Sequence, residues 1–292
     1  MNDYVISCCT PVDYTKEALA ELGVETVFYH ILLDGEDYAD DFGESISAET
    51  LRMYLVAGHD VKTSQVSVGE YLTFFRPFLE AGRDILHITL SSGLSGTLNS
   101  ATLASRQLLE EFPERKILVV DSLGGSCGYG MIVEEAAKLR NSGKNIEEVR
   151  DWVEDHRLEV QHAFFSTDLT YFIKGGRIPR AAGILAQKMK ICPIITGNAA
   201  GEMVMSDKIR TKKKAMNRIV ERIDELATGG YNYTGKVMIS HTDPQLAEET
   251  AALVRERCPH ISDLVVRPLG VTFSSHSGPG CVALFFWGQK RV

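Results

Sequence analysis

Short apolar runs that alternate with helix-like segments constrain the fold of this chain more than any other feature. The run DILHITL (84–90) precedes a segment with apolar residues at helical spacing (97–112), and RKILVVD (115–121) precedes another (125–141). Buried strands that alternate with helices form βαβ units. The first half is therefore predicted to be α/β, with a mostly parallel sheet flanked by helices. Its other predicted elements are a strand at 25–33 and helices at 47–58 and 69–82.

The second half has a different pattern, in which β-rich runs flank glycine turns. CPIITGNAAGEMVMSDK (192–208) is typical of a β-hairpin around GNAAG. The order of elements predicts a second α/β domain with a mixed or antiparallel sheet, so we expect domains at 1–160 and 161–292. The remaining predicted elements are two short helices around a glycine turn (169–189), helices at 212–227 and 244–257, and strands at 160–167, 236–242, 263–270 and 281–288.

Length, charge and cysteine content narrow the class of protein. A chain of 292 residues with 44% hydrophobic residues is long enough for two domains, and its net charge of -8 argues against general binding of nucleic acid or anionic membranes. The chain begins without the pattern of a secretory signal, and no apolar run reaches the roughly 18 residues of a membrane helix. Six cysteines without a C-x-x-C spacing are best interpreted as reduced and buried. We therefore expect a cytoplasmic protein.

The segment SSGLSGT (Ser91–Thr97) follows a predicted strand and opens a predicted helix. Ligands of parallel sheets bind at that edge, and a helix N-terminus offers unpaired N–H groups to an anion. A plain N-cap needs one hydroxyl, whereas Ser91, Ser92, Ser95 and Thr97 supply four. The pattern favours an anion-binding loop.

A nucleophilic serine is the competing interpretation of the same loop. GLSGT differs from the G-x-S-x-G elbow of hydrolases because Thr97 replaces the last glycine. A serine hydrolase that acts on a lipid or ester through Ser95 and His276 is therefore kept as the alternative function.

Two further segments carry candidate binding groups. Thr63, Ser64 and Gln65 precede Ser67-x-x-Glu70, which is a capping box for the next helix, so the first three are not needed for capping. His276 stands before a Gly-Pro-Gly turn, where a backbone bend can project it into a cleft.

Two basic runs stand out in this acidic chain. The first occupies the start of a predicted helix, where cations oppose the helix dipole, and this placement suggests a phosphate or an acidic partner rather than only a solvated face. The second lies in the turn KGGRIPR. Their members are Lys208, Arg210, Lys212, Lys213 and Lys214 in the first run, and Lys174, Arg177 and Arg180 in the second.

Motifs for cofactors and metals are missing from the sequence. There is no G-x-x-x-x-G-K-[ST], no G-x-G-x-x-G and no H-E-x-x-H or other metal spacing. We therefore expect neither a metal nor a cofactor, and a binding protein rather than an enzyme.

Six motifs together resemble one known family. KTSQVS, SSGLSGT, VVDS, GGRI, IRTKKKA and HSGPG occur in the order and spacing of the DegV family of bacterial fatty-acid-binding proteins, which includes the binding subunits of fatty acid kinase. The resemblance spans Val5 to Gly288. It implies two α/β domains that enclose one long-chain fatty acid, with its carboxylate at their junction. It also implies presentation of that carboxylate to the kinase catalytic subunit for acyl-phosphate formation.

The resemblance also assigns site residues. Thr63 and Ser95 would hold the carboxylate with His276 nearby, and Arg210 matches an arginine that engages the kinase. The first loop, SCCTPVDY, departs from the D-S-T pattern usual in the family, so the resemblance does not assign the residues at the rim of the site. The supporting residues expected at the carboxylate are Ser64, Ser92, Gly96 and Thr97, and those expected to join Arg210 in partner docking are Arg177 and Lys212.

Overall fold

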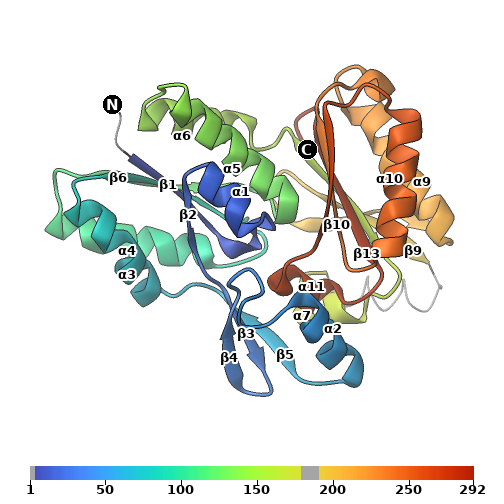
Figure 1. Ribbon diagram of the computed structural model, residues 1–292, viewed down its shortest axis with the longest axis horizontal. Coiled ribbons are helices and arrows are strands. Elements are labelled where there is room, and N and C mark those ends of the chain that lie inside the picture. Colours follow the sequence, from blue (N-terminus) through green and yellow to red (C-terminus); the bar gives the residue numbers. More distant parts are fainter. Residues whose placement is uncertain (1–3, 179–190) are drawn as a thin grey trace.

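The first half of the molecule is built on a parallel sheet. The computed structural model describes residues 4–178 and 191–292 (Figure 1). Helices α3 (Val68–Glu80) and α4 (Thr97–Glu111) cover one face of this sheet, and α5 (Ser126–Asn141) and α6 (Ile146–His156) cover the other. The predicted parallel α/β arrangement is confirmed. In spatial order the strands are β2 (Val24–Val27), β1 (Tyr4–Cys9), β6 (Asp84–Thr89) and β7 (Ile117–Asp121).

The single strand predicted at 25–33 is wrong. These residues form β2 and β3 (His30–Leu33), which belong to different sheets. β3 pairs antiparallel with β4 (Glu36–Ala39) and with β5 (Val61–Ser64). The turn between β3 and β4 is Asp34-Gly35, with φ of 51° and 92°, and this dipeptide is a strong signal for a tight hairpin. The chain therefore leaves the parallel sheet and builds a small one beside α2 (Ala48–Ala57).

The second half contains a six-stranded sheet. All neighbouring strands are antiparallel except β11 and β12, so the sheet is mixed, and β9 and β10 form the predicted hairpin. Helices α9 (Lys212–Leu226) and α10 (Pro244–Arg257) pack against it. In spatial order the strands are β10 (Met203–Ile209), β9 (Cys192–Gly197), β8 (Val160–Ser166), β13 (Cys281–Trp287), β11 (Lys236–His241) and β12 (Asp263–Pro268).

Several short helices complete the fold. α7 (Thr170–Gly175) matches the first of the two helices predicted at 169–189, and the second lies outside the described residues. α1 (Lys16–Glu21), α6 and α11 (Val271–Ser277) were not predicted, although Asn145 and Glu148 form a capping box at the start of α6. Single turns of 3-10 helix occur at Thr10–Val12 and Gly230–Asn232.

The largest group of buried apolar side chains combines the two halves. It includes Ile88 and Tyr129 from the first half with Met238 and Phe285 from the second. All six cysteines are buried and form no disulfide, as predicted. Among the helices that the structure describes, none has the length and apolar character needed to cross a bilayer.

Candidate functional site

The small sheet and helix α11 bring Thr63 and His276 together. Thr63 lies on β5, and its Oγ1 is 2.8 Å from Nε2 of His276. Gly175 at the end of α7 makes room for the imidazole, because a Cβ at this position would lie 2.3 Å from Nδ1 of His276. The sequence prediction that these two residues share a site is consistent with this contact.

The imidazole of His276 is neutral at physiological pH. Its burial, and then the nearby charge of Arg177, lowers its pKa to about 3. A neutral imidazole has one donor and one acceptor nitrogen. His276 can therefore orient the Thr63 hydroxyl, and it adds no positive charge of its own.

Ser95 lies in the loop before α4, and its hydroxyl takes part in three hydrogen bonds. Its Oγ lies 2.9 Å from the Tyr29 hydroxyl, accepts from the backbone N–H of Thr97 at 3.3 Å, and donates to Oε1 of Gln65 at 3.4 Å. Gln65 also donates to Oγ of Ser100 at 3.1 Å. Gln65 therefore joins the Thr63–Gln65 segment to the serine loop, a role that the sequence did not reveal.

The other hydroxyls of the serine loop have different surroundings. Thr97 is fully buried, with its Oγ1 2.8 Å from the Tyr71 hydroxyl, and Oγ of Ser91 donates to the carbonyl of Gly201 at 2.8 Å. Ser92 is exposed, and its backbone N–H donates to Asp121. The N-cap residue of α4 is Gly96, which has no side chain to cap the helix, and Ser95 accepts from the first backbone N–H of α4. Capping therefore involves one of the four hydroxyls of this loop.

Ser64 and Gly96 are two more residues predicted to support the carboxylate. Ser64 is exposed, and its hydroxyl donates to the Gln65 carbonyl at 3.4 Å. At Gly96 a Cβ would lie 2.8 Å from Oε1 of Gln65, so a side chain there would displace the Gln65 amide. Thr63 and Ser95, the two hydroxyl residues expected to hold the carboxylate, are only partly buried, so a ligand can reach them.

Arg177 lies beside the candidate carboxylate residues. It lines one solvent-open hollow together with Thr63, His276, Lys62 and Lys174. Its guanidinium donates to the carbonyl of Gly175 at 2.5 Å, and partial burial lowers its pKa. Arg177 therefore places a positive charge next to Thr63 and His276. From the sequence alone, we expect Arg177 to take part in partner docking.

Arg210 and Lys212 lie in a separate hollow. It lies at the start of α9 and also contains Thr167, Asp168 and Cys192. Both basic side chains are exposed. A macromolecular partner can therefore reach them without access to Thr63 and Ser95.

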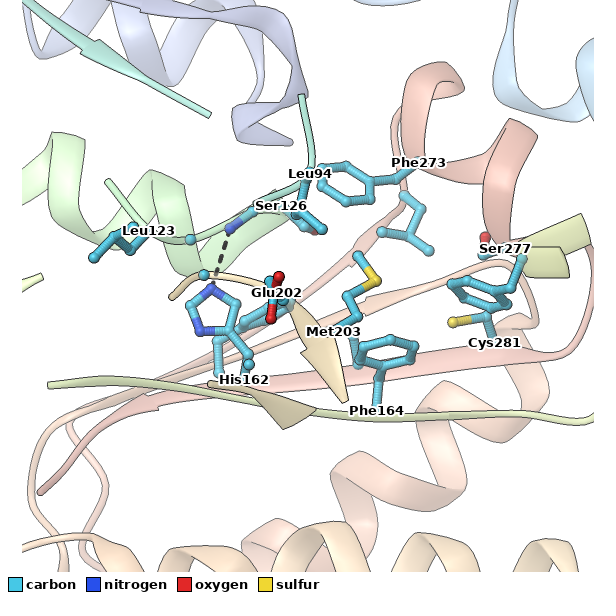
Figure 2. A pocket seen from close by; sticks show the side chains of 18 of the residues that line it. Leu94, Leu123, Ser126, His162, Phe164, Glu202, Met203, Phe273, Ser277 and Cys281 are labelled. Carbon is cyan, nitrogen blue, oxygen red and sulfur yellow. Dashed lines mark hydrogen bonds between the residues drawn. The ribbon is translucent and has the colours of Figure 1, made fainter. Parts of the chain in front are cut away.

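An apolar pocket lies between the six-stranded sheet and loops of the first half of the molecule (Figure 2). It encloses about 540 Å³ of space not occupied by atoms, part of it open to solvent. Its floor comes from β8 and β13, where Phe164 pairs with Ala283 and His162 pairs with Phe285. Leu94, Phe172, Leu269 and Phe273 cover it from loops and short helices, and Met203 covers it from the start of β10.

His162 contributes little polarity to this pocket. Burial lowers its pKa to about 3, so the ring is neutral. Nε2 accepts from the backbone N–H of Gly125 at 3.2 Å, which is the dashed line in Figure 2, and Nδ1 lies 3.1 Å from the carbonyl of Val160. Because both nitrogens are used by the backbone, His162 serves as part of the apolar wall.

Residues that line the apolar pocket are neighbours along the chain of residues in the polar cluster, which consists of Thr63, Gln65, Ser95 and His276. Leu94 lines the pocket while Ser95 belongs to the polar cluster, and Ser277 lines the pocket while His276 bonds to Thr63. A ligand with a polar head and an apolar tail matches this arrangement. Residues two apart on β8 and β13 face the pocket, and this alternation is a weak signal for the pocket floor in the sequence. The register between the two strands is not readable from one sequence.

The geometry of a serine hydrolase is not assembled within the described residues. The imidazole of His276 bonds to Thr63, and the hydroxyl of Ser95 bonds to Tyr29 and Gln65. A nucleophilic serine requires a base within hydrogen-bond reach of its own hydroxyl. Likewise, no group of three or more His, Cys, Asp or Glu side chains in the described part of the chain can hold a metal ion.

Similar sequences are found in several bacteria. The family model described as an uncharacterised protein of the DegV family matches residues 10–289. The DegV domain-containing protein YteA of Lactococcus lactis subsp. lactis is 36% identical over 258 residues, which cover 88% of each chain. A DegV domain-containing protein of Clostridium perfringens is 29% identical over 292 residues, which cover 100% of this chain and 99% of the relative.

Solved structures share the fold over nearly the whole length. A DegV family protein from Thermus thermophilus, described by its fatty acid binding, has a TM-score of 0.84 at 26% identity, covering 98% of this chain and 99% of that chain. The Streptococcus pneumoniae Fatty Acid Kinase (Fak) B3 protein loaded with linoleic acid has a TM-score of 0.84 at 21% identity, covering 98% and 100%. At the lower identity the similarity concerns the fold.

The pKa shift of His276 predicts a pH-dependent contribution to stability. Its folded pKa of about 3 lies below the roughly 6.5 of an unfolded chain, so the contribution is lost as pH falls below about 6.5. Gln at this position keeps a donor and an acceptor but does not titrate. Between pH 7.5 and 5 we expect the unfolding free energy of the unmodified protein to fall by about 2 kcal/mol more than that of His276→Gln. Urea unfolding at both pH values measures this, and a pH-independent difference would contradict it.

Proposed function

The chain belongs to the DegV family, and we propose that it binds one long-chain fatty acid between its two halves. The carboxylate would lie at Thr63, Ser95 and His276, and the acyl chain would fill the apolar pocket. The observation that carries this proposal is that Leu94 and Ser277 line the apolar pocket while their neighbours along the chain, Ser95 and His276, make the polar contacts with Tyr29 and Thr63. The fatty acid binding described for the Thermus thermophilus relative supports the same assignment.

The two parts of the site would contribute differently to binding. Each buried methylene contributes about 0.8 kcal/mol, so the acyl chain would dominate affinity. The hydroxyls of Thr63 and Ser95 would fix the position of the carboxylate as hydrogen-bond donors. Arg177, at the rim of the same hollow, would favour the ionised form of the head group.

We further propose that the bound carboxylate is presented to a fatty acid kinase for acyl-phosphate formation. The hollow that contains Thr63, His276 and Arg177 is open to solvent, which suits transfer of a phosphoryl group to a carboxylate held there. The similarity in fold to the Fak B3 protein supports this assignment. The chain itself would act as a binding subunit without catalysis, in the cytoplasm.

Docking of the kinase would use a different surface. Arg210 and Lys212 are exposed at the start of α9, away from the candidate carboxylate residues, and their positive charge suits an acidic surface on the partner. Arg177 would face the same partner from the rim of the head-group hollow. A kinase in contact with both regions would cover the open carboxylate.

Removal of the carboxylate donors should weaken ligand binding. Each of Ser95→Ala and Thr63→Val removes one hydrogen bond to a charged group, for which we expect about 10- to 100-fold weaker binding of oleate. Native mass spectrometry of the purified protein and titration of lipid-free protein with oleate measure this. Ser64→Ala is the matched control, because its hydroxyl is exposed and bonds only to a carbonyl. A lipid-free protein that also ignores added oleate and palmitate would refute the proposed function.

Filling the pocket floor should shorten the preferred acyl chain. Ala283 lies opposite Phe164 in the pocket, so Ala283→Leu adds three carbon atoms and would occupy space equivalent to about three methylenes of ligand. We expect about 10- to 100-fold weaker binding of oleate with little change for decanoate. Competition between the two acids on both proteins measures this. Equal losses for the long and the short acid would mean that the acyl chain lies elsewhere.

Partner docking should be separable from ligand binding. We expect Arg210→Ala to weaken association with a fatty acid kinase catalytic subunit at least about 10-fold while the content of bound lipid stays unchanged. Arg255→Ala is a suitable control, because Arg255 is also exposed but lies on α10 and pairs with Glu248. Equal association of Arg210→Ala and the unmodified protein with the kinase would contradict this docking surface.

A further inference from the structure

Two buried carboxyl groups bond to the start of α11, and the proposed function does not yet use either of them. Oδ1 of Asp13 accepts from the backbone N–H of Gly270 at 3.1 Å, and Oδ2 of Asp40 accepts from the Thr272 hydroxyl at 2.6 Å. Asp13 is 8% exposed and Asp40 is 4% exposed. Because both belong to the first half of the molecule, they join α11 to that half.

Asp13 also bonds to a second segment of the wall of the apolar pocket. Oγ of Ser126, the first residue of α5, lies 2.5 Å from Oδ2 of Asp13. Ser126 lines the pocket, as Figure 2 shows, and so does Leu269, which precedes Gly270. Asp13 therefore bridges two segments of the wall, one at the start of α5 and one just before α11.

The backbone is adapted to this bridge. Asp13 and Ser126 both have φ of 53°, in the left-handed region that residues other than glycine rarely adopt. Such conformations persist where the surrounding contacts hold them. At Gly270 a Cβ would lie 2.5 Å from Oδ1 of Asp13, so the absence of a side chain permits the approach of the carboxyl. The bridge is thus built into the local backbone on each side.

A hollow that is open to solvent lies on the other side of this wall. Asp13 and Asp40 line the hollow, and Leu269 lines both the hollow and the apolar pocket. The wall is therefore thin at the start of α11. If its contacts opened, water would reach the acyl chain, and the stabilisation from buried methylenes would be lost.

The cations that line this hollow are engaged elsewhere. Lys16 on α1 pairs with Glu44 at 2.6 Å, and the guanidinium of Arg267 lies 5.4 Å from the centre of the Tyr14 ring. In the described part of the chain neither cation pairs with the two buried carboxyls. A negative charge on either carboxyl is therefore not neutralised by direct contact.

The remaining ionisable groups around the two carboxyls supply no positive charge. Burial keeps the Cys127 thiol and the Tyr14 hydroxyl neutral, because it raises the pKa of both. From β11 the neutral hydroxyl of Ser240 approaches Ser126 at 3.1 Å. The other groups are acids, namely Glu17, Asp41 and Glu44.

Ionisation is consequently unfavourable at both carboxyls. Burial raises the pKa of Asp13 to about 8, although the hydrogen bonds with Ser126 and Gly270 oppose the rise. Burial raises the pKa of Asp40 to about 6, against the opposing effect of its bond with Thr272. A desolvated carboxylate without a cation is costly, and contact with water relieves that cost.

We infer that Asp13 and Asp40 are positioning residues that keep the wall of the acyl pocket closed at the start of α11, and that the wall opens when Asp13 ionises. An ionised Asp13 gains hydration from the solvent-open hollow if the start of α11 moves away from it. That movement exposes the acyl chain and displaces the helix that carries His276. The inference rests on the proposed function, because it concerns the affinity of the same site for fatty acid.

Oleate binding at pH 7 and pH 9 tests the inference. At pH 9, one unit above the pKa of Asp13, about one molecule in ten keeps the neutral carboxyl, so we expect about 10-fold weaker binding than at pH 7. Asp13→Asn cannot ionise and keeps an acceptor for Gly270, so its affinity should change less than about 2-fold. Ionisation of oleate itself cancels in this comparison. Asp155→Asn is the matched control, because Asp155 is exposed on α6 and should leave the pH profile unaltered.

The contact of Asp40 is tested with a pair of variants. Thr272→Val has nearly the shape of threonine but no donor for Asp40, whereas Thr272→Ser keeps the hydroxyl. We expect Thr272→Val to bind oleate about 5- to 10-fold more weakly at both pH values, and Thr272→Ser to restore most of the affinity. Equal binding by Thr272→Val and the unmodified protein would contradict the role of Asp40.

A second measurement uses the unmodified protein, so it does not depend on the folding of a variant. A ligand that binds better to the form with neutral Asp13 must in turn raise the pKa of Asp13. In ¹³C spectra of protein labelled at the aspartate carboxyls, we expect the resonance that titrates near pH 8 to shift its midpoint to higher pH on saturation with oleate.

The outcomes separate the inference from the proposed function. An equal loss of oleate affinity between pH 7 and pH 9 in Asp13→Asn and the unmodified protein would overturn the inference. A titration of Asp13 that oleate leaves unchanged would overturn it as well. Failure of the unmodified protein to bind oleate at pH 7 would instead refute the proposed function, and the inference with it.

Discussion

The hydrogen bond between Thr63 and His276 is the interaction on which the arrangement of the site depends. It joins residues 213 positions apart in the chain, one on a strand of the small sheet and one on α11 from the second half. Burial keeps the imidazole in this bond neutral, and the absence of a side chain at Gly175 leaves space for the ring. The same helix supplies Phe273 and Ser277 to the apolar pocket, so this contact connects the polar head-group residues with the pocket lining.

Local charge at the site differs in sign from the charge of the molecule. The chain has a net charge of -8, yet the hollow beside Thr63 contains three cations, Lys62, Lys174 and Arg177, against one carboxylate, that of Asp60. The field at a site is set by nearby groups, since exposed charges beyond about 10 Å are largely screened by salt. An acidic protein can therefore attract a carboxylate to one place on its surface without general affinity for anions.

The sequence predicted the parallel sheet and the hairpin because their apolar runs and turns are local signals. It also predicted the approach of Thr63 to His276, through motifs rather than through physical periodicity. It missed the division of residues 25–33, where the Asp34-Gly35 turn was the available signal. The positions of Arg177, Gln65 and Tyr29 could not be predicted, because each depends on tertiary contacts: the reversal of the chain at Gly176, the meeting of two loops, and burial against the serine loop.

The shared core has a consequence for how this protein can be divided. Phe164, Met238 and Phe285 pack in the same apolar cluster as Ile88 and Tyr129, and Oγ of Ser91 bonds to the backbone of Gly201 across the same boundary. A fragment that ended near residue 160 would leave apolar side chains of the first half in contact with water. The two halves therefore share part of their apolar core, although the second half also has a cluster of its own, and an exchange of either half between relatives would have to preserve the surface at which they meet.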